Sequence, residues 1–121
     1  MDTNSSTGKP YDLTMINAMC DGNTQFLEKL LLVFADNIVK DTQEMKVAAS
    51  AGNWTEVAQL AHKMKSSLGH FKVDSLKDTI RGLEHPGNTD VNTLNTYVAD
   101  FENVINAVIT NLKQEFPQVF N

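Results

Sequence analysis

The sequence is poor in the residues that interrupt or cross-link a polypeptide. Its 121 residues include 3 prolines, 6 glycines and a single cysteine, Cys20. One cysteine excludes an intramolecular disulfide bond and a cysteine-rich zinc site. No proline stands between Pro10 and Pro86, so no pyrrolidine ring breaks a helix in that stretch. The fold must therefore be held together by apolar side chains, which make up 41% of the residues.

Long apolar runs and an excess of basic residues are also missing. The longest apolar run, residues 30–35, is far shorter than the roughly 20 residues that cross a bilayer. The first ten residues contain no basic segment followed by an apolar one, so no secretory signal is visible. With 15 acidic and 10 basic residues, the chain lacks the basic excess of a nucleic-acid-binding domain. We expect a cytoplasmic protein that neither enters a membrane nor binds nucleic acid.

Apolar residues recur at three- and four-residue steps, which predicts amphipathic helices, whereas the alternation typical of strands is absent. Asn23 or Thr24 is expected to cap a long helix that Gly52 ends, and Asn53 to cap the next one. The expected helices cover about Tyr11–Met19, Thr24 to Gly52, Trp54–His70, a segment capped by Asp74 or Ser75 and carrying Leu76, Ile80 and Leu83, and a last helix with the inner stripe Val91, Leu94, Val98, Phe101, Ile105, Val108 and Leu112.

These helices predict an all-α fold, an up-and-down antiparallel four-helix bundle with a short additional N-terminal helix. A chain of 121 residues suits one domain with one core. We expect a flexible N-terminal segment over residues 1–10, the helical bundle over 11–116 and a C-terminal tail over 117–121. Trp54 is expected in the core, and the methionines Met15, Met19, Met45 and Met64 are expected to fill gaps in it, although Met15, Met19 and Phe26 could be partly exposed near the turn after the first helix.

The predicted third helix carries a histidine, His62, directly after a core position. Its imidazole is therefore expected at the edge of the buried stripe, at least partly in solvent. Lys65 and Ser66 share its face because they follow at three and four residues, while Ala58 and Gly69 are small. Small neighbours leave the imidazole open to a large partner, although a lone surface histidine most commonly has no role.

The segment from Ala61 to Phe71, AHKMKSSLGHF, resembles the histidine-phosphotransfer (HPt) family. The family signature is an Ala-His pair followed by an apolar residue at two, lysine at three, glycine or serine at four, and glycine at seven. Two positions depart from the common pattern, since Ser66 and Lys72 stand where many members have glycine. Lys72 would be strained if its position required a positive φ. Either the helix ends differently here or the turn has shifted.

The resemblance implies that His62 takes a phosphoryl group from a receiver-domain aspartate and passes it to another receiver. A neutral imidazole is a suitable nucleophile, and Lys65 is placed to offset charge on the phosphorylated ring. If the next helix returns antiparallel, His62 faces the region of Gly82. Glu84 resembles the orienting partner of the family's chemotaxis-kinase branch, which accepts a hydrogen bond from Nδ1–H and leaves Nε2 as the nucleophile. Arg81 could add a second cation.

The resemblance also implies which proteins bind the domain. In the family, the first helices and the histidine helix together dock receiver domains. The expected partners are response-regulator receiver domains and a hybrid sensor kinase, and any magnesium would belong to the receiver. Because no glycine-rich phosphate loop is present, we expect a phosphoryl carrier rather than an enzyme. We also expect it to be a monomer and to have no cofactor of its own. The candidate docking residues are Ala58, Lys63, Ser66, Gly69, Met15 and Met19.

Three other interpretations remain open at this point. The bundle could dock and regulate a receiver or sensor kinase without being phosphorylated, or it could be purely structural. A zinc site built from His62, His70, His85 and Cys20 would need unusual convergence, because the first two point about 80° apart on a helix.

Overall fold

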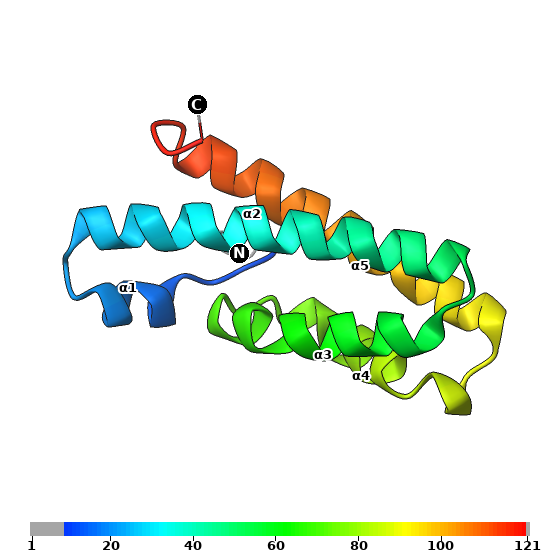
Figure 1. Cartoon of the computed structure of the whole chain (residues 1–121). Helices are drawn as coiled ribbons and strands as arrows, with labels where there is room; N and C mark the ends of the chain where they lie inside the picture. The colour runs from blue at the N-terminus through cyan, green and yellow to red at the C-terminus, as the bar shows by residue number, and fades with distance from the viewer. Residues whose placement is uncertain (1–8, 121) are drawn as a thin grey trace.

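Helices account for most of residues 9–120, the part of the chain that the computed structural model describes. Those residues contain no strand, which confirms the all-α prediction, and none of their helices is long and apolar enough to cross a membrane. Most of the predicted N-terminal segment, and residue 121 of the predicted tail, lie outside the described residues. In chain order the elements are α1 (Thr14–Cys20), α2 (Thr24–Ser50), α3 (Trp54–His70), the 3₁₀ helix η2 (Asp74–Leu76), α4 (Lys77–Glu84), the 3₁₀ helix η3 (Pro86–Asn88) and α5 (Val91–Glu115) (Figure 1).

The helices pack around one apolar core. α2 contacts α3 and α5, and α4 contacts α3 and α5, so these four helices close a ring, while α1 packs against α2 (Figure 1). Burying a large apolar side chain stabilises the fold by about 1.5–3 kcal/mol. The contact between α3 and α4 also lets residues of α4 reach the exposed edge of α3. The largest wholly buried side chains are Leu31, Met45, Leu68, Leu76, Leu83, Leu94, Phe101, Ile105 and Leu112.

Side-chain caps begin the three long helices. Asn23 Oδ1 accepts a hydrogen bond from the Phe26 amide at 3.0 Å, which confirms Asn23 as the cap of α2. Asn53 Oδ1 accepts from the Glu56 amide at 3.2 Å and begins α3 where the sequence predicted it. Asp90 caps α5 in the same way, through the Thr93 amide.

The structure corrects the predicted start of the first helix. That helix begins at Thr14 rather than Tyr11, because the preceding chain is held by tertiary contacts. The Asp12 amide donates to the Phe71 carbonyl at 3.0 Å, and the buried Tyr11 hydroxyl donates to Glu115 Oε1 at 2.7 Å. Burial and the neighbouring carboxylate of Glu115 raise the pKa of Tyr11.

Three further expectations about the helices were wrong or incomplete. The segment after α3 begins as the 3₁₀ helix η2, and α4 follows without a side-chain cap from Asp74 or Ser75. Val91, placed in the inner stripe of the last helix, is 55% exposed because it stands at the first residue of α5, beyond the core. Met45 and Met64 are buried as predicted, whereas Trp54 is half-buried against the edge of the core.

Lys72 ends the third helix in a left-handed conformation, with φ of +55°. The Val73 amide donates to the Leu68 carbonyl at 2.9 Å and the Lys72 amide to the Gly69 carbonyl at 3.1 Å. This pair of bonds is a Schellman motif, the same ending that Gly52 gives α2 with φ of +73°. The turn has therefore not shifted, and lysine occupies a position that favours glycine.

Replacing Lys72 with glycine should stabilise the fold. A left-handed residue with a Cβ costs about 1–2 kcal/mol, and the greater chain entropy of unfolded glycine offsets about 0.5–1 kcal/mol of that. We expect Lys72→Gly to raise the free energy of unfolding by about 0.5–1 kcal/mol, measured by urea denaturation. Lys40→Gly, an exposed lysine inside α2, is the matched control and should destabilise by about 1 kcal/mol. A loss of stability in Lys72→Gly would contradict the assignment of strain.

Candidate functional site

His62 projects from the exposed edge of α3. Its side chain is 73% exposed, although the neighbouring Ala61 and Met64 are buried in the core. Because Ala61 and Met64 are packed in the core, they hold the backbone of His62 in place, while the imidazole ring extends into solvent. The half-buried Ala58, one turn earlier, presents only a methyl group beside it.

Glu84, the last residue of α4, reaches across to this imidazole. His62 Nδ1 and Glu84 Oε2 are 2.7 Å apart, and the glutamate side chain is only 14% exposed. An ionised carboxylate can only accept hydrogen bonds, so the proton in this contact belongs to Nδ1 of the imidazole. In a neutral ring, that tautomer leaves the lone pair on Nε2, the nitrogen that does not face Glu84.

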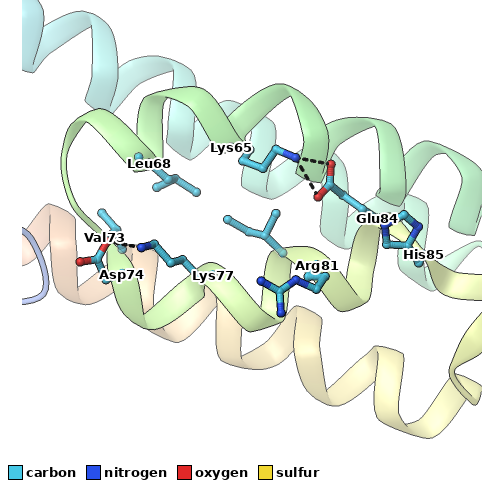
Figure 2. Close-up of a pocket in the computed structure, with 10 residues that line it drawn as sticks. Lys65, Leu68, Val73, Asp74, Lys77, Arg81, Glu84 and His85 are labelled. Carbon is cyan, nitrogen blue, oxygen red and sulfur yellow. Dashed lines mark hydrogen bonds and ion pairs between the residues drawn. The ribbon is translucent and has the colours of Figure 1, made fainter.

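Lys65 holds the same carboxylate from one turn further along α3. Its Nζ lies 3.2 Å from Oε1 and 3.1 Å from Oε2 of Glu84 (Figure 2). Burial disfavours the charged glutamate, but the hydrogen bonds from His62 and Lys65, together with the lysine charge, outweigh it and hold the pKa of Glu84 below its usual value. The carboxylate is therefore ionised at neutral pH and available as an acceptor.

The glycine of α4 lies on the opposite side of that helix from the histidine. A Cβ added to Gly82 would collide with the ring of Tyr97 in α5, so the two helices approach closely here. Sequence reasoning placed the region of Gly82 opposite His62 and named Glu84, within a turn of that glycine, as the hydrogen-bond acceptor; Glu84 is the residue of α4 that reaches the imidazole. The reason is the tight α4–α5 contact, which turns Gly82 towards α5.

Arg81, predicted as a second cation, does not contact the His62–Glu84 pair. Its Nη1 lies 3.4 Å from Asp78 Oδ1, and both side chains are largely exposed. Arg81 and Lys65 line a groove of about 420 Å³ between α3 and α4 (Figure 2). The buried Ile80 also lines it. The guanidinium therefore lines the groove and pairs with Asp78 rather than with the imidazole or Glu84.

Sequence reasoning missed two residues beside His62. A shallow hollow of about 370 Å³ is lined by Ala58, Gln59, His62, Glu84 and His85. Gln59 precedes the histidine by three residues, a helix spacing that could have indicated a shared face. His85 joins the hollow because it follows Glu84 directly, and only the geometry of the turn after α4 reveals this.

The candidate docking residues are distributed over two helices. Ser66 and Gly69 are exposed on α3, and Met15 and Met19 are exposed on α1. Lys63 pairs with Asp41 of α2, a buried acid that sequence reasoning did not single out. Within residues 9–120, no group of three or more His, Cys, Asp or Glu side chains is arranged to hold a metal ion.

Comparison with known proteins identifies one family. The family model described as the Hpt domain matches residues 29–115, which is more than half of the chain. The match begins inside α2 and includes all of α3 and α4, so it contains both His62 and Glu84. No curated protein and no solved structure matches the chain.

Removing the Glu84 charge should weaken the preference of His62 for the tautomer with its proton on Nδ1. A hydrogen bond to a charged acceptor contributes about 1.5–3 kcal/mol, enough to make the Nδ1–H form dominant in the wild-type chain. In Glu84→Gln we expect a mixture of the two neutral tautomers, observed as a change in the imidazole ¹⁵N chemical shifts at pH 8. Glu44→Gln, an exposed glutamate of α2, is the control. Unchanged shifts in Glu84→Gln would show that another group sets the tautomer.

The lowered pKa of Glu84 also predicts how stability depends on pH. The pKa of Glu84 in the folded chain lies below its ordinary value of 4.5. Its contribution to the free energy of unfolding is therefore complete above about pH 4.5 and is lost as the pH falls through the folded pKa. The difference in unfolding free energy between wild type and Glu84→Gln should therefore be larger at pH 7 than at pH 3. Urea denaturation at the two pH values measures it, and a constant difference would contradict the assignment.

Proposed function

Because the chain belongs to the Hpt domain family, we propose that His62 is the residue that carries its phosphoryl group. Hpt domains are phosphocarrier modules of two-component signalling rather than kinases. In the proposed relay, His62 accepts a phosphoryl group from the aspartate of one receiver domain and passes it to another. The observation that carries this proposal is the exposed imidazole whose Nδ1 is held by Glu84 at 2.7 Å.

The proposed transfer is a displacement at phosphorus. The lone pair of Nε2 forms the phosphorus–nitrogen bond as the acyl phosphate bond of the receiver breaks, and that bonding pair leaves with the aspartate carboxylate. Positive charge develops on the imidazole during attack, and the adjacent Glu84 carboxylate stabilises it. The receiver supplies the magnesium ion that neutralises the moving phosphoryl oxygens.

Lys65 has a second role in this proposal. Before transfer its ammonium pairs with Glu84, and its side chain is 53% exposed, so it can turn towards a phosphoryl group on His62 without leaving a buried cavity. Arg81 lies further along the groove and could contribute only longer-range attraction, since its exposed charge is screened by solvent.

The remaining details of the proposal concern the setting of the relay. Response-regulator receivers and a hybrid sensor kinase are the proposed partners, and the domain acts as a cytoplasmic monomer. The ring of contacts among α2, α3, α4 and α5 supports an up-and-down order of the four longer helices. The proposed folded unit is residues 11–116, and Val119 and Phe120 of the predicted tail also pack against its core.

Labelled phosphoryl transfer tests the role of His62. A receiver domain carrying ³²P on its aspartate is mixed with the wild-type chain, and label should appear that is stable to alkali and lost in acid, as expected for phosphohistidine. His62→Gln should take no label. His70→Gln is the matched control, and label should still appear on it, because its imidazole at the end of α3 is not the proposed acceptor.

A small phosphoryl donor separates the chemistry of the histidine from recognition of the partner. Potassium phosphoramidate needs no docking surface, so it should phosphorylate His62 in the wild-type chain, observed by ³¹P NMR. Receiver binding without label on His62 would favour a docking module that is not phosphorylated. Neither label nor binding with any of several receivers would leave a structural bundle.

A further inference from the structure

A groove between α1, α2 and α3 contains a buried carboxylate that the relay chemistry does not use. The groove has a volume of about 300 Å³ and is lined mainly by apolar side chains, among them Met19, Phe34 and Ile38. Asp41 of α2 lines it as well, with a side chain that is only 6% exposed. An ionised group in such surroundings is costly unless it is paired and hydrogen-bonded.

The partner of Asp41 is weakly held. Lys63 Nζ lies 3.1 Å from Asp41 Oδ1, and the lysine side chain is 64% exposed. Among residues 9–120, no side chain donates a hydrogen bond to the second oxygen, Oδ2. Because the lysine side chain is mostly solvated, its ammonium can move into water at little desolvation cost, so another cation can replace it as long as the buried carboxylate remains paired. The carboxylate thus keeps unused acceptor capacity inside an apolar groove.

We propose that this groove receives a basic side chain flanked by apolar side chains, contributed by the receiver domain that docks against His62. Asp41 is the counter-ion of that basic group, and Lys63 moves into solvent when the group arrives. The inference rests on the proposed function for the identity of the partner. The chemistry of the occupant follows from charge complementarity, because an apolar wall and a buried anion together fit an amphipathic cation.

The position of the groove suits this role. Lys63 follows His62 directly on α3, but successive helix residues point about 100° apart, so Lys63 is turned to Asp41 of α2 and His62 to Glu84 of α4. A partner domain that covers the exposed face of α3 can therefore reach both the imidazole and the groove. Met19 and Val33, which are exposed at the groove, offer apolar contact to the flanking residues of the partner. A guanidinium fits best, because its planar fork can donate to both carboxylate oxygens, whereas an ammonium acts as a point charge.

A small cation tests the groove without knowledge of the cognate receiver. Benzamidinium has an apolar ring and a planar cationic fork, and benzamide is its neutral counterpart of similar shape. In amide NMR titrations of the ¹⁵N-labelled chain at pH 8, benzamidinium should shift the signals of Asn37, Asp41 and Ser67. We expect it to bind about tenfold more tightly than benzamide. Equal binding of the two probes to the wild-type chain would overturn the proposal without recourse to any variant.

Two substitutions should act in opposite directions. Asp41→Asn removes the charge with little change of shape and should weaken benzamidinium binding about tenfold. Lys63→Met removes the competing cation and should strengthen it several-fold. Asp36→Asn, an exposed acid of α2 outside the groove, is the control and should change nothing. If Lys63→Met weakens binding, or Asp41→Asn leaves it intact, the pair only ties α2 to α3 and the proposal is wrong.

Phosphoryl transfer then separates this proposal from the relay itself. Asp41→Asn should slow the transfer from a receiver to His62 at subsaturating receiver concentrations and leave phosphorylation by phosphoramidate unchanged. A chain that binds benzamidinium but takes no label from any receiver would refute the proposed function and not the cation site. A chain that takes label at the same rate with and without Asp41 would refute its role in docking.

Discussion

The site depends on the hydrogen bonds that the carboxylate of Glu84 accepts from α3. This carboxylate stands at the end of α4 and accepts hydrogen bonds from two residues of α3, His62 and Lys65. One largely buried charge therefore joins two helices and sets the orientation of the imidazole ring of His62. The approach of α4 to α3 is fixed by buried leucine and isoleucine side chains, so the core determines the geometry at the surface.

A carrier of phosphoryl groups has two conflicting needs, and this arrangement meets both. The imidazole must be exposed to large partners, yet its tautomer must be fixed. His62 is exposed at Nε2 and restrained at Nδ1, and no cavity encloses it. In the proposed relay the receiver domain supplies the magnesium ion, so the bundle itself needs only to present the imidazole.

Much of this arrangement could be predicted from the sequence where local interactions decide it. The caps Asn23 and Asn53 and the limits of α3 follow from short-range hydrogen bonds and from apolar spacing. The start of α1 could not be predicted, because Tyr11 is held by Glu115 at the other end of the chain. The burial of Asp41 was equally invisible, since it depends on how α1, α2 and α3 meet. The glutamate was found through family resemblance, and the turning of Gly82 towards α5 required the three-dimensional packing.

The Tyr97 ring lies so close to Gly82 that a Cβ at position 82 would collide with it. The residues at these two positions therefore constrain each other. A side chain at 82 requires that the Tyr97 ring turn aside, that a smaller residue replace tyrosine at 97, or that α4 move outward from α5. An outward movement would carry Glu84 with it and change its separation from the histidine. In evolution the two positions are therefore expected to vary together, so that a larger residue at 82 is accompanied by a smaller one at 97. Such covariation would record selection on the distance between acceptor and imidazole, although neither residue touches the imidazole.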